Sequence, residues 1–164
     1  MNKTPDSHKL TNLQELDVLL PREIRGQSHT IPRIVSAVRR GELGLTKPSR
    51  PRGSFLLLGP TGVGKTETVV VTTNHVFGDG KLFRFDMSEF QNQEALGLLL
   101  GARLGESGYL GAVRDRAAEG SLLFDEAEKA HPRVLDILLQ LLDAARLTVA
   151  TGQTLDFSGF YVWL

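Results

Sequence analysis

The order of apolar and polar positions along the chain predicts buried strands that alternate with helices. Four short apolar runs have the length and composition of strands that are covered on both faces, and we expect them at residues 54–58, 82–85, 121–124 and 160–164. Helical stretches lie between them, at residues 65–76, 94–100 and 132–145. Strands that alternate with helices in this way are typical of an α/β fold with a mainly parallel sheet.

The helical stretches differ in the strength of their pattern. In residues 132–145 the apolar side chains recur at helical spacing, and acidic and amide side chains occupy the opposite face. In residues 65–76 the run Thr68–Thr73 is β-branched, so local propensity disagrees with the helix that the fold requires. Residues 146–157 predict a β-hairpin that turns near Gly152.

The first 50 residues give weaker signals. Residues 1–18 predict a loose polar lead-in with one short helix around residues 13–20. A second helix is expected to begin near Pro32 and to end at Gly41 or Gly44. Proline suits the first helical position because a backbone N–H there would have no partner within the helix. Residues 46–53 are rich in proline, glycine and arginine and predict a loop.

Composition narrows the class of protein. A chain of 164 residues suits one domain, and 41% hydrophobic with 23% charged residues excludes a disordered polymer. The absence of cysteine excludes disulfides and thiolate metal sites. The amino-terminal sequence has no apolar core of a signal peptide, and no apolar run approaches the roughly 20 residues of a membrane helix. We therefore expect a soluble, cytoplasmic protein with no membrane partner.

Charge is balanced overall but not locally. Lysine and arginine number 19, as do aspartate and glutamate, so the net charge gives no sign of a nucleic-acid partner. Residues 22–52, however, hold eight basic residues against two acidic ones. That excess is compatible with contact to nucleic acid or to an acidic face of a neighbouring subunit, although a solvated helix face is the commoner explanation.

The strongest chemical signal follows the first predicted strand. The segment fits the phosphate-loop pattern G-x-x-x-x-G-K-[ST] completely, and it opens a predicted helix, as the pattern requires. Its glycines allow backbone N–H groups to turn toward phosphate oxygens, Lys65 would reach the β- and γ-phosphates, and the Thr66 hydroxyl would hold Mg²⁺. The alternative is a glycine-rich turn without function. The candidate phosphate-binding residues are Gly59, Pro60, Thr61, Gly62, Val63, Gly64, Lys65 and Thr66.

A second signal lies about 60 residues later, where the apolar run 121–124 ends in Asp125 and Glu126. After a phosphate loop, a carboxylate at the end of such a strand would sit near Mg²⁺, which is the role we assign to Asp125. Glu126 would polarise the water that attacks the γ-phosphate. The alternative is that the two carboxylates cap the following helix.

Three motifs together resemble a known family. The phosphate loop, the segment FDMSEF at residues 85–90 and the segment LFDEAEKAHP at residues 123–132 resemble the second, C-terminal ATPase module of the Clp/heat-shock-100 AAA+ unfoldases. Further short matches occur in the same order at residues 25–27, 141–143 and 146–148. The resemblance covers residues 19–164, which we expect to form the domain after the lead-in.

The resemblance implies a P-loop NTPase fold, the large subdomain of an AAA+ module with its parallel sheet flanked by helices. The last strand, at residues 160–164, would lie between the strand before the phosphate loop and the strand that ends at Asp125. Ile24 and Arg25 would lie beside the adenine. The implied cofactors are ATP and Mg²⁺, the implied partner is a ring of like subunits, and hydrolysis would be coupled to protein unfolding or disaggregation.

The sequence also departs from the family. The family has a pore loop with a Gly-Tyr-Val-Gly core that grips unfolded polypeptide; residues 108–111 are similar, so Tyr109 either has that role or begins a helix over residues 110–116. The family continues beyond the last strand into a sensor residue, an arginine finger, a fifth strand and a helical lid. We therefore expect a subdomain that is incomplete at its carboxyl end and a weak ATPase activity of the isolated chain.

Two other functions are compatible with the same motifs. One is a nucleotide-binding interaction module with little turnover. The other is an AAA+ ATPase of a mobile element that acts on nucleic acid, which only the basic stretch at residues 22–52 supports.

Overall fold

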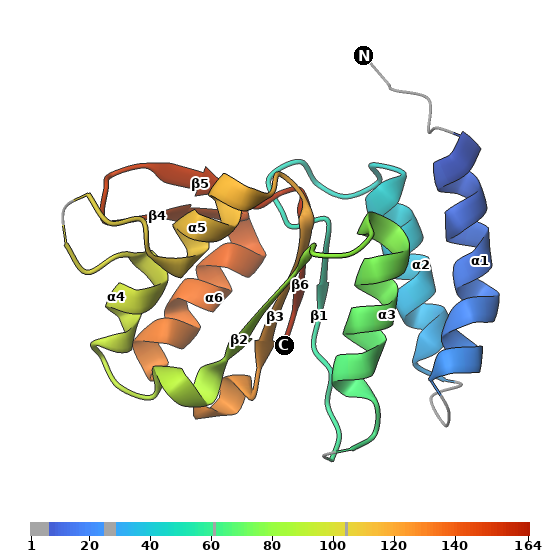
Figure 1. Cartoon of the computed structure of the whole chain (residues 1–164), viewed down its shortest axis with the longest axis horizontal. Coiled ribbons are helices and arrows are strands. Elements are labelled where there is room, and N and C mark those ends of the chain that lie inside the picture. The colour runs from blue at the N-terminus through green and yellow to red at the C-terminus, as the bar shows by residue number, and fades with distance from the viewer. Residues whose placement is uncertain (1–6, 25–28, 61, 104) are drawn as a thin grey trace.

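The computed structural model describes residues 7–24, 29–60, 62–103 and 105–164, which form a sheet with helices on both faces (Figure 1). The helices are α1 (Ser7–Glu23), α2 (Ile31–Glu42), α3 (Lys65–Phe77), α4 (Ala95–Leu100), α5 (Gly108–Arg116) and α6 (Pro132–Ala144), with short 3-10 helices η1 (Met87–Phe90) and η2 (Ala127–Lys129). The strands are β1 (Gly53–Phe55), β2 (Leu82–Asp86), β3 (Gly120–Asp125), β4 (Arg146–Thr148), β5 (Thr154–Asp156) and β6 (Phe160–Trp163). Within the described part of the chain, no helix is both long enough and apolar enough to cross a bilayer.

Four strands form one parallel sheet in the order β1-β6-β3-β2. The last strand, β6, therefore lies between β1 and β3, as the resemblance implies. The remaining strands, β4 and β5, pair as a separate antiparallel hairpin, with Gly152 in its turn at φ 82°. The parallel α/β architecture and the hairpin are both confirmed.

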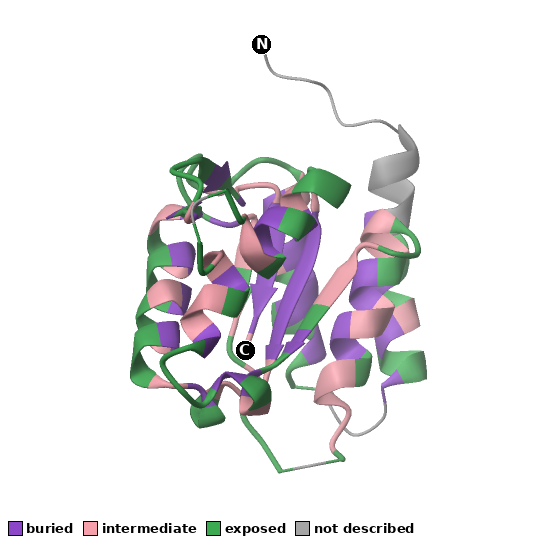
Figure 2. Ribbon diagram, turned by 60° about the vertical axis from the view of Figure 1, so that its left-hand side comes forward, coloured by how far each residue is buried: buried purple, intermediate pink, exposed green. Residues whose placement is uncertain are grey.

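The two central strands carry side chains into both helical layers. Figure 2 shows these strands as buried, and alternate residues of each strand belong to different apolar clusters. Leu123, Tyr161 and Trp163 pack on the side of α1, α2 and α3. Leu122, Phe124, Phe160 and Val162 pack on the side of α4, α5 and α6. Burial on both faces explains why these strands are continuously apolar in the sequence.

The first helix is longer than the sequence pattern predicts. α1 runs from Ser7 to Glu23, and Leu13, Leu16 and Leu20 are buried in the same cluster as α2 and α3. The expected boundary between residues 18 and 19 therefore falls inside a helix. The predicted helix was too short because the residues that extend it, 7–12 and 21–23, are mostly polar and include Pro21, so they give no apolar periodicity.

The β-branched segment after the phosphate loop is helical throughout α3, as the fold requires. Thr68, Val69, Thr72 and Thr73 are buried there. The Thr68 hydroxyl donates to the Gly64 carbonyl at 2.7 Å, and the Thr73 hydroxyl donates to Ser121 Oγ at 2.8 Å. Burial against β3 thus outweighs the modest helix propensity of these residues.

The assigned strand β1 is shorter than the predicted run at residues 54–58. Pairing with the last strand nevertheless continues past Phe55, because the Leu57 N–H donates to the Leu164 carbonyl at 2.8 Å. The side chains of Leu56 and Leu58 are 65% and 82% exposed. The apolar run therefore extends the strand but is only partly buried.

A polar network joins α2 to the sheet. The Tyr161 hydroxyl lies 3.0 Å from both the Val38 carbonyl and Glu42 Oε1. Arg52 donates to Glu42 at 2.8 Å and to Glu119 at 2.9 Å. Burial, reinforced by Glu42, raises the pKa of Tyr161 above its usual range, so the hydroxyl stays protonated. Burial alone would lower the pKa of Arg52, but the two glutamates outweigh it and the pKa is raised.

We predict that Tyr161→Phe lowers the free energy of unfolding by about 1–3 kcal/mol, because a buried carboxylate and a buried carbonyl lose their shared donor. Urea denaturation measures this change. Tyr109→Phe is the matched control, since the Tyr109 side chain is about half exposed and should tolerate the change. Equal loss of stability in both variants would contradict the network's role.

Candidate functional site

The phosphate-loop segment connects β1 to the first turn of α3. Gly62 and Gly64 have φ values of 81° and 87°, a backbone region that glycine enters without steric cost. Gly64 is the N-cap of α3, so the loop ends at the helix N-terminus, where unpaired N–H groups and the positive end of the helix dipole lie. The predicted strand, loop and helix are all present in this order; Thr61 lies outside the described residues.

Lys65 and Thr66 occupy the first turn of α3. The Lys65 ammonium donates to the carbonyls of Gly59 and of Pro60, the latter at 3.1 Å, and so lies against the loop. The Thr66 hydroxyl lies 3.5 Å from Asp125 Oδ2, although the two residues are 59 positions apart in the sequence. The structure thus brings the end of the phosphate loop to the end of β3.

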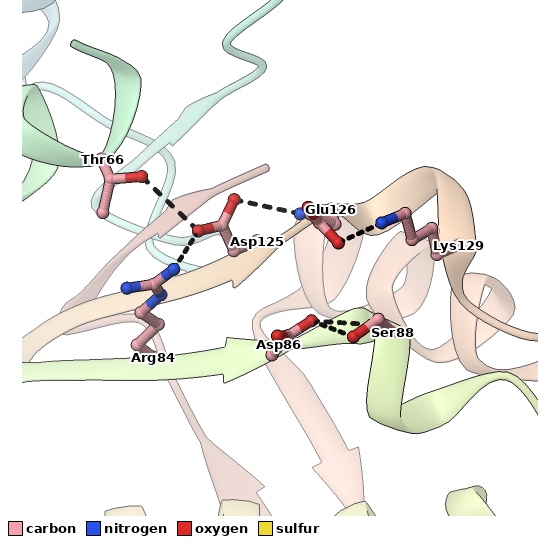
Figure 3. Close-up of polar contacts among 7 residues, drawn as sticks. All are labelled: Thr66, Arg84, Asp86, Ser88, Asp125, Glu126 and Lys129. Carbon is pink, nitrogen blue, oxygen red and sulfur yellow. Dashed lines mark hydrogen bonds and ion pairs between the residues drawn. The ribbon is translucent and has the colours of Figure 1, made fainter. Parts of the chain in front are cut away.

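Asp125 is the last residue of β3, and Glu126 follows it with a left-handed backbone (φ 56°, ψ 42°) that turns the chain sharply into η2. Figure 3 shows the contacts of both carboxylates. Asp125 Oδ2 accepts from Arg84 at 2.7 Å, and Glu126 Oε2 accepts from Lys129 at 2.5 Å. The hydrogen bond with Glu126 raises the pKa of Lys129 above its ordinary value.

The two halves of the site line one cavity of about 850 Å³. The phosphate loop with Lys65 and Thr66 forms one wall, and Arg84, Asp125 and Glu126 form another. Most ligand pockets have volumes of about 300–1,000 Å³, so the cavity has the size of a small-molecule site.

A smaller cavity of about 230 Å³ shares Leu56–Leu58, Gly64 and Lys65 with the first. Thr30, Ile31 and Ile34, from the start of α2, contribute to its lining and make it largely apolar. The buried side chain of Ile24 lies next to Gly64, which lines this cavity. A Cβ atom added to Gly64 would lie 3.4 Å from Ile24 Cγ2. Arg25 lies outside the described residues.

The donor set is compatible with Mg²⁺. A hydroxyl and a carboxylate are oxygen ligands, and this ion is commonly held by one or two carboxylates together with substrate phosphates and waters. Among the residues that the structure describes, no group of three or more histidine, cysteine, aspartate or glutamate side chains could hold a metal alone. Thr66 and Asp125 thus supply two oxygen donors, which is fewer than the octahedral coordination of Mg²⁺ requires.

Sequence reasoning missed two sets of residues in these cavities. Arg84 was not singled out, because an arginine within a strand has no spacing relation to the phosphate loop. Ile31 and Ile34 carry no chemical signal in the sequence, because apolar side chains at the start of a helix predict only core packing; they belong to a core cluster as well as to the small cavity. The match at residues 85–90, adjacent to Arg84, was the available signal for the first set.

Tyr109 lies in the first turn of α5 and not in a loop. Its ring packs edge-on against Phe90, with the two ring centroids 6.4 Å apart. Of the two interpretations of residues 108–111, the structure shows the helix, which begins at Gly108. Tyr109 remains about half exposed.

Four of the eight basic residues at positions 22–52 form ion pairs within the chain. Arg22 pairs with Glu23, Arg39 with Asp17, Arg50 with Asp143, and Arg52 with Glu42 and Glu119. Paired arginines contribute less to a positive surface field, so this observation disfavours the nucleic-acid interpretation.

Residues 50–162 match the sequence profile of the AAA domain (Cdc48 subfamily). The chain is 43% identical over 93% of its length to heat shock protein 100 of Trypanosoma brucei brucei, of which it covers 18%. It is 44% identical over 91% of its length to chaperone protein ClpB of Aquifex aeolicus, of which it covers 15%. For ClpB of Vibrio cholerae the identity is 44% over 96% of the chain, which covers 19% of that relative. The chain thus spans less than a fifth of the length of these relatives.

We predict that Ser88→Ala raises the pKa of Asp86, which ends β2 beside Asp125. The Ser88 hydroxyl and N–H both donate to Asp86 Oδ1, at 2.6 and 2.9 Å, and lower its pKa from the usual 3.8. A lowered carboxyl pKa stabilises the fold above pH 3.8, and this contribution is lost as the pH falls through the folded-state pKa. NMR titration of the carboxyl carbon measures the shift. Ser158→Ala, which removes the hydroxyl that donates to Asp156, is the control and should leave the pKa of Asp86 unchanged.

Proposed function

We propose that this chain, which belongs to the AAA domain family (Cdc48 subfamily), binds ATP with Mg²⁺ in the larger cavity and hydrolyses it there. One observation carries the proposal: the Thr66 hydroxyl and the Asp125 carboxylate lie 3.5 Å apart in the same cavity as the phosphate loop. A glycine-rich turn without function does not require a strand-end carboxylate from a distant segment to meet the first turn of the helix.

The loop backbone and Lys65 would bind the phosphates. N–H groups at the start of α3 are without helical partners, and a phosphate at this position is favoured by the helix dipole. The Lys65 ammonium, which now contacts two loop carbonyls, would extend to the β- and γ-phosphates.

Thr66 and Asp125 would hold Mg²⁺. When bound, the ion neutralises negative charge on the β- and γ-phosphate oxygens. Asp125 is only partly exposed and lies at the end of a central strand, so its position is fixed by the sheet.

Glu126 would orient a water for attack on the γ-phosphate and accept its proton. The backbone of Glu126 is left-handed, and the carboxylates of Asp125 and Glu126 have different partners. Asp125 contacts Thr66 and Arg84, whereas Glu126 contacts Lys129. To act as a base through Oε2, Glu126 must give up its contact with Lys129, because the Lys129 ammonium already donates to that oxygen.

The base of the nucleotide would occupy the smaller cavity. Its wall of Ile31, Ile34 and leucines provides the apolar surface that a purine ring requires. Ile24 lies beside Gly64 and supports this wall, and Arg25 is retained as a candidate contact to the adenine.

The function of a complete protein is a wider proposal that rests on the relatives. Two of them are named chaperones and one a heat shock protein. We propose that the module works within a ring of like subunits and couples hydrolysis to unfolding or disaggregation of polypeptides. A contact to polypeptide through Tyr109 would have to come from the exposed start of α5.

We predict that Lys65→Ala weakens ATP binding about ten- to hundredfold, the cost of losing a charge-assisted hydrogen bond. Isothermal titration calorimetry with Mg-ATP measures the dissociation constant. Lys47→Ala, which removes an exposed lysine from the loop before β1, is the control and should bind as the wild type does. Equal affinity of Lys65→Ala and the wild type would refute the phosphate-loop assignment.

We predict that Glu126→Gln reduces hydrolysis about 10²-fold or more without weakening ATP binding, because an amide cannot accept the proton. Asp125→Asn should instead weaken the dependence of binding on Mg²⁺. Phosphate release under single-turnover conditions, with the chain in excess over ATP, makes slow hydrolysis measurable. Glu94→Gln changes an exposed carboxylate outside the cavity and is the control. Unchanged turnover in both site variants would show that the acidic pair is structural and would favour the interaction module.

A further inference from the structure

Arg84 donates a hydrogen bond to the Asp125 carboxylate, which the proposed function assigns to the metal. Its Nη2 lies 2.7 Å from Asp125 Oδ2, the same oxygen that the Thr66 hydroxyl approaches at 3.5 Å (Figure 3). Arg84 lines the larger cavity, and its side chain is 56% exposed against 22% for Asp125. The guanidinium therefore lies mostly in solvent, whereas the carboxylate lies at the end of β3 and is mostly covered.

The sheet register explains why an arginine reaches this carboxylate. Arg84 pairs with Leu123 and Asp86 pairs with Asp125, so two carboxylates lie side by side where β2 and β3 end. Arg84 and Asp86 share one face of β2, because side chains two positions apart point to the same side of a strand. Among the described residues, Arg84 is the one basic side chain within ion-pair distance of Asp125.

We propose that Arg84 competes with the divalent cation for Asp125 Oδ2, so that metal binding requires the guanidinium to leave. This inference rests on the proposed function, since it concerns the same site. In this role Arg84 lowers the affinity of the site for the metal. With Arg84 present, the metal increases nucleotide affinity less than it would if Arg84 were absent.

A different role would reverse the sign. If Arg84 only oriented Asp125 toward the metal, its removal would lower metal affinity, because the carboxylate would lose a fixed direction. Competition predicts a rise instead, because the cation would no longer have to displace a guanidinium. The direction of change therefore distinguishes the two roles.

The experiment compares ADP binding in Mg²⁺ with ADP binding in EDTA, by calorimetry on the full chain. ADP is used because it lacks the γ-phosphate, which a displaced arginine could contact. The measured quantity is the ratio of the two affinities. For Arg84→Gln we expect this ratio to rise about two- to fivefold above the wild-type value, the range that partly exposed ion pairs span.

Two further variants complete the experiment. Arg84→Lys retains a cation that can reach Asp125, and its ratio should stay closer to the wild-type value than that of Arg84→Gln. Arg50→Gln is the matched control: Arg50 is 52% exposed and pairs with Asp143 at 2.9 Å, but it does not line the cavity. Its ratio should equal that of the wild type, and circular dichroism with urea denaturation confirms that each variant is folded.

The outcomes separate this inference from the proposed function. A ratio for Arg84→Gln that is unchanged or lower, with ADP binding by the wild type intact, would overturn the competition and leave the nucleotide site standing. A wild-type chain that binds ADP in neither condition would overturn both.

Discussion

Trp163 connects three parts of the molecule that carry the candidate site. Its ring stacks on Phe55 of β1 with the centroids 3.9 Å apart, and its indole N–H donates to Ser121 Oγ of β3 at 3.2 Å. The same serine oxygen accepts from Thr73 of α3 at 2.8 Å. Because all four side chains belong to different elements, this contact fixes β6 against both neighbouring strands and fixes α3 over the sheet.

The geometry of the site follows from that packing. β1 leads into the phosphate loop and β3 ends at Asp125, but these two strands do not pair with each other, since β6 lies between them. The Thr66–Asp125 contact therefore spans the width of β6, with α3 crossing above it. Thr66 and Asp125, which are 59 residues apart in the sequence, meet because β6, from a later part of the chain, lies between β1 and β3.

The sequence contained most of this arrangement for identifiable reasons. Strands buried on both faces leave continuous apolar runs, so β3 and β6 could be predicted within a residue. β2 is an edge strand with an exposed Arg84, and it could be predicted from its remaining apolar residues and from its place between two helices. The phosphate loop could be predicted because its backbone requires glycine at fixed positions. The extent of α1 could not, because the residues that extend it beyond the predicted 13–20, at 7–12 and 21–23, are mostly polar and include Pro21. Arg84 could not either, because its importance arises from the register of β2 against β3, which no local pattern records.

The three charged residues to which the proposed function assigns roles have partners within the chain. Lys65 contacts loop carbonyls, Asp125 contacts Arg84, and Glu126 contacts Lys129. Binding of the proposed metal nucleotide would then be an exchange of partners, in which each of these protein groups leaves one favourable contact for another. Such an exchange would yield a smaller net free energy than binding to unpaired charges, because the existing contacts must first be broken. Affinity in such a site depends as much on the contacts that are given up as on those that are formed.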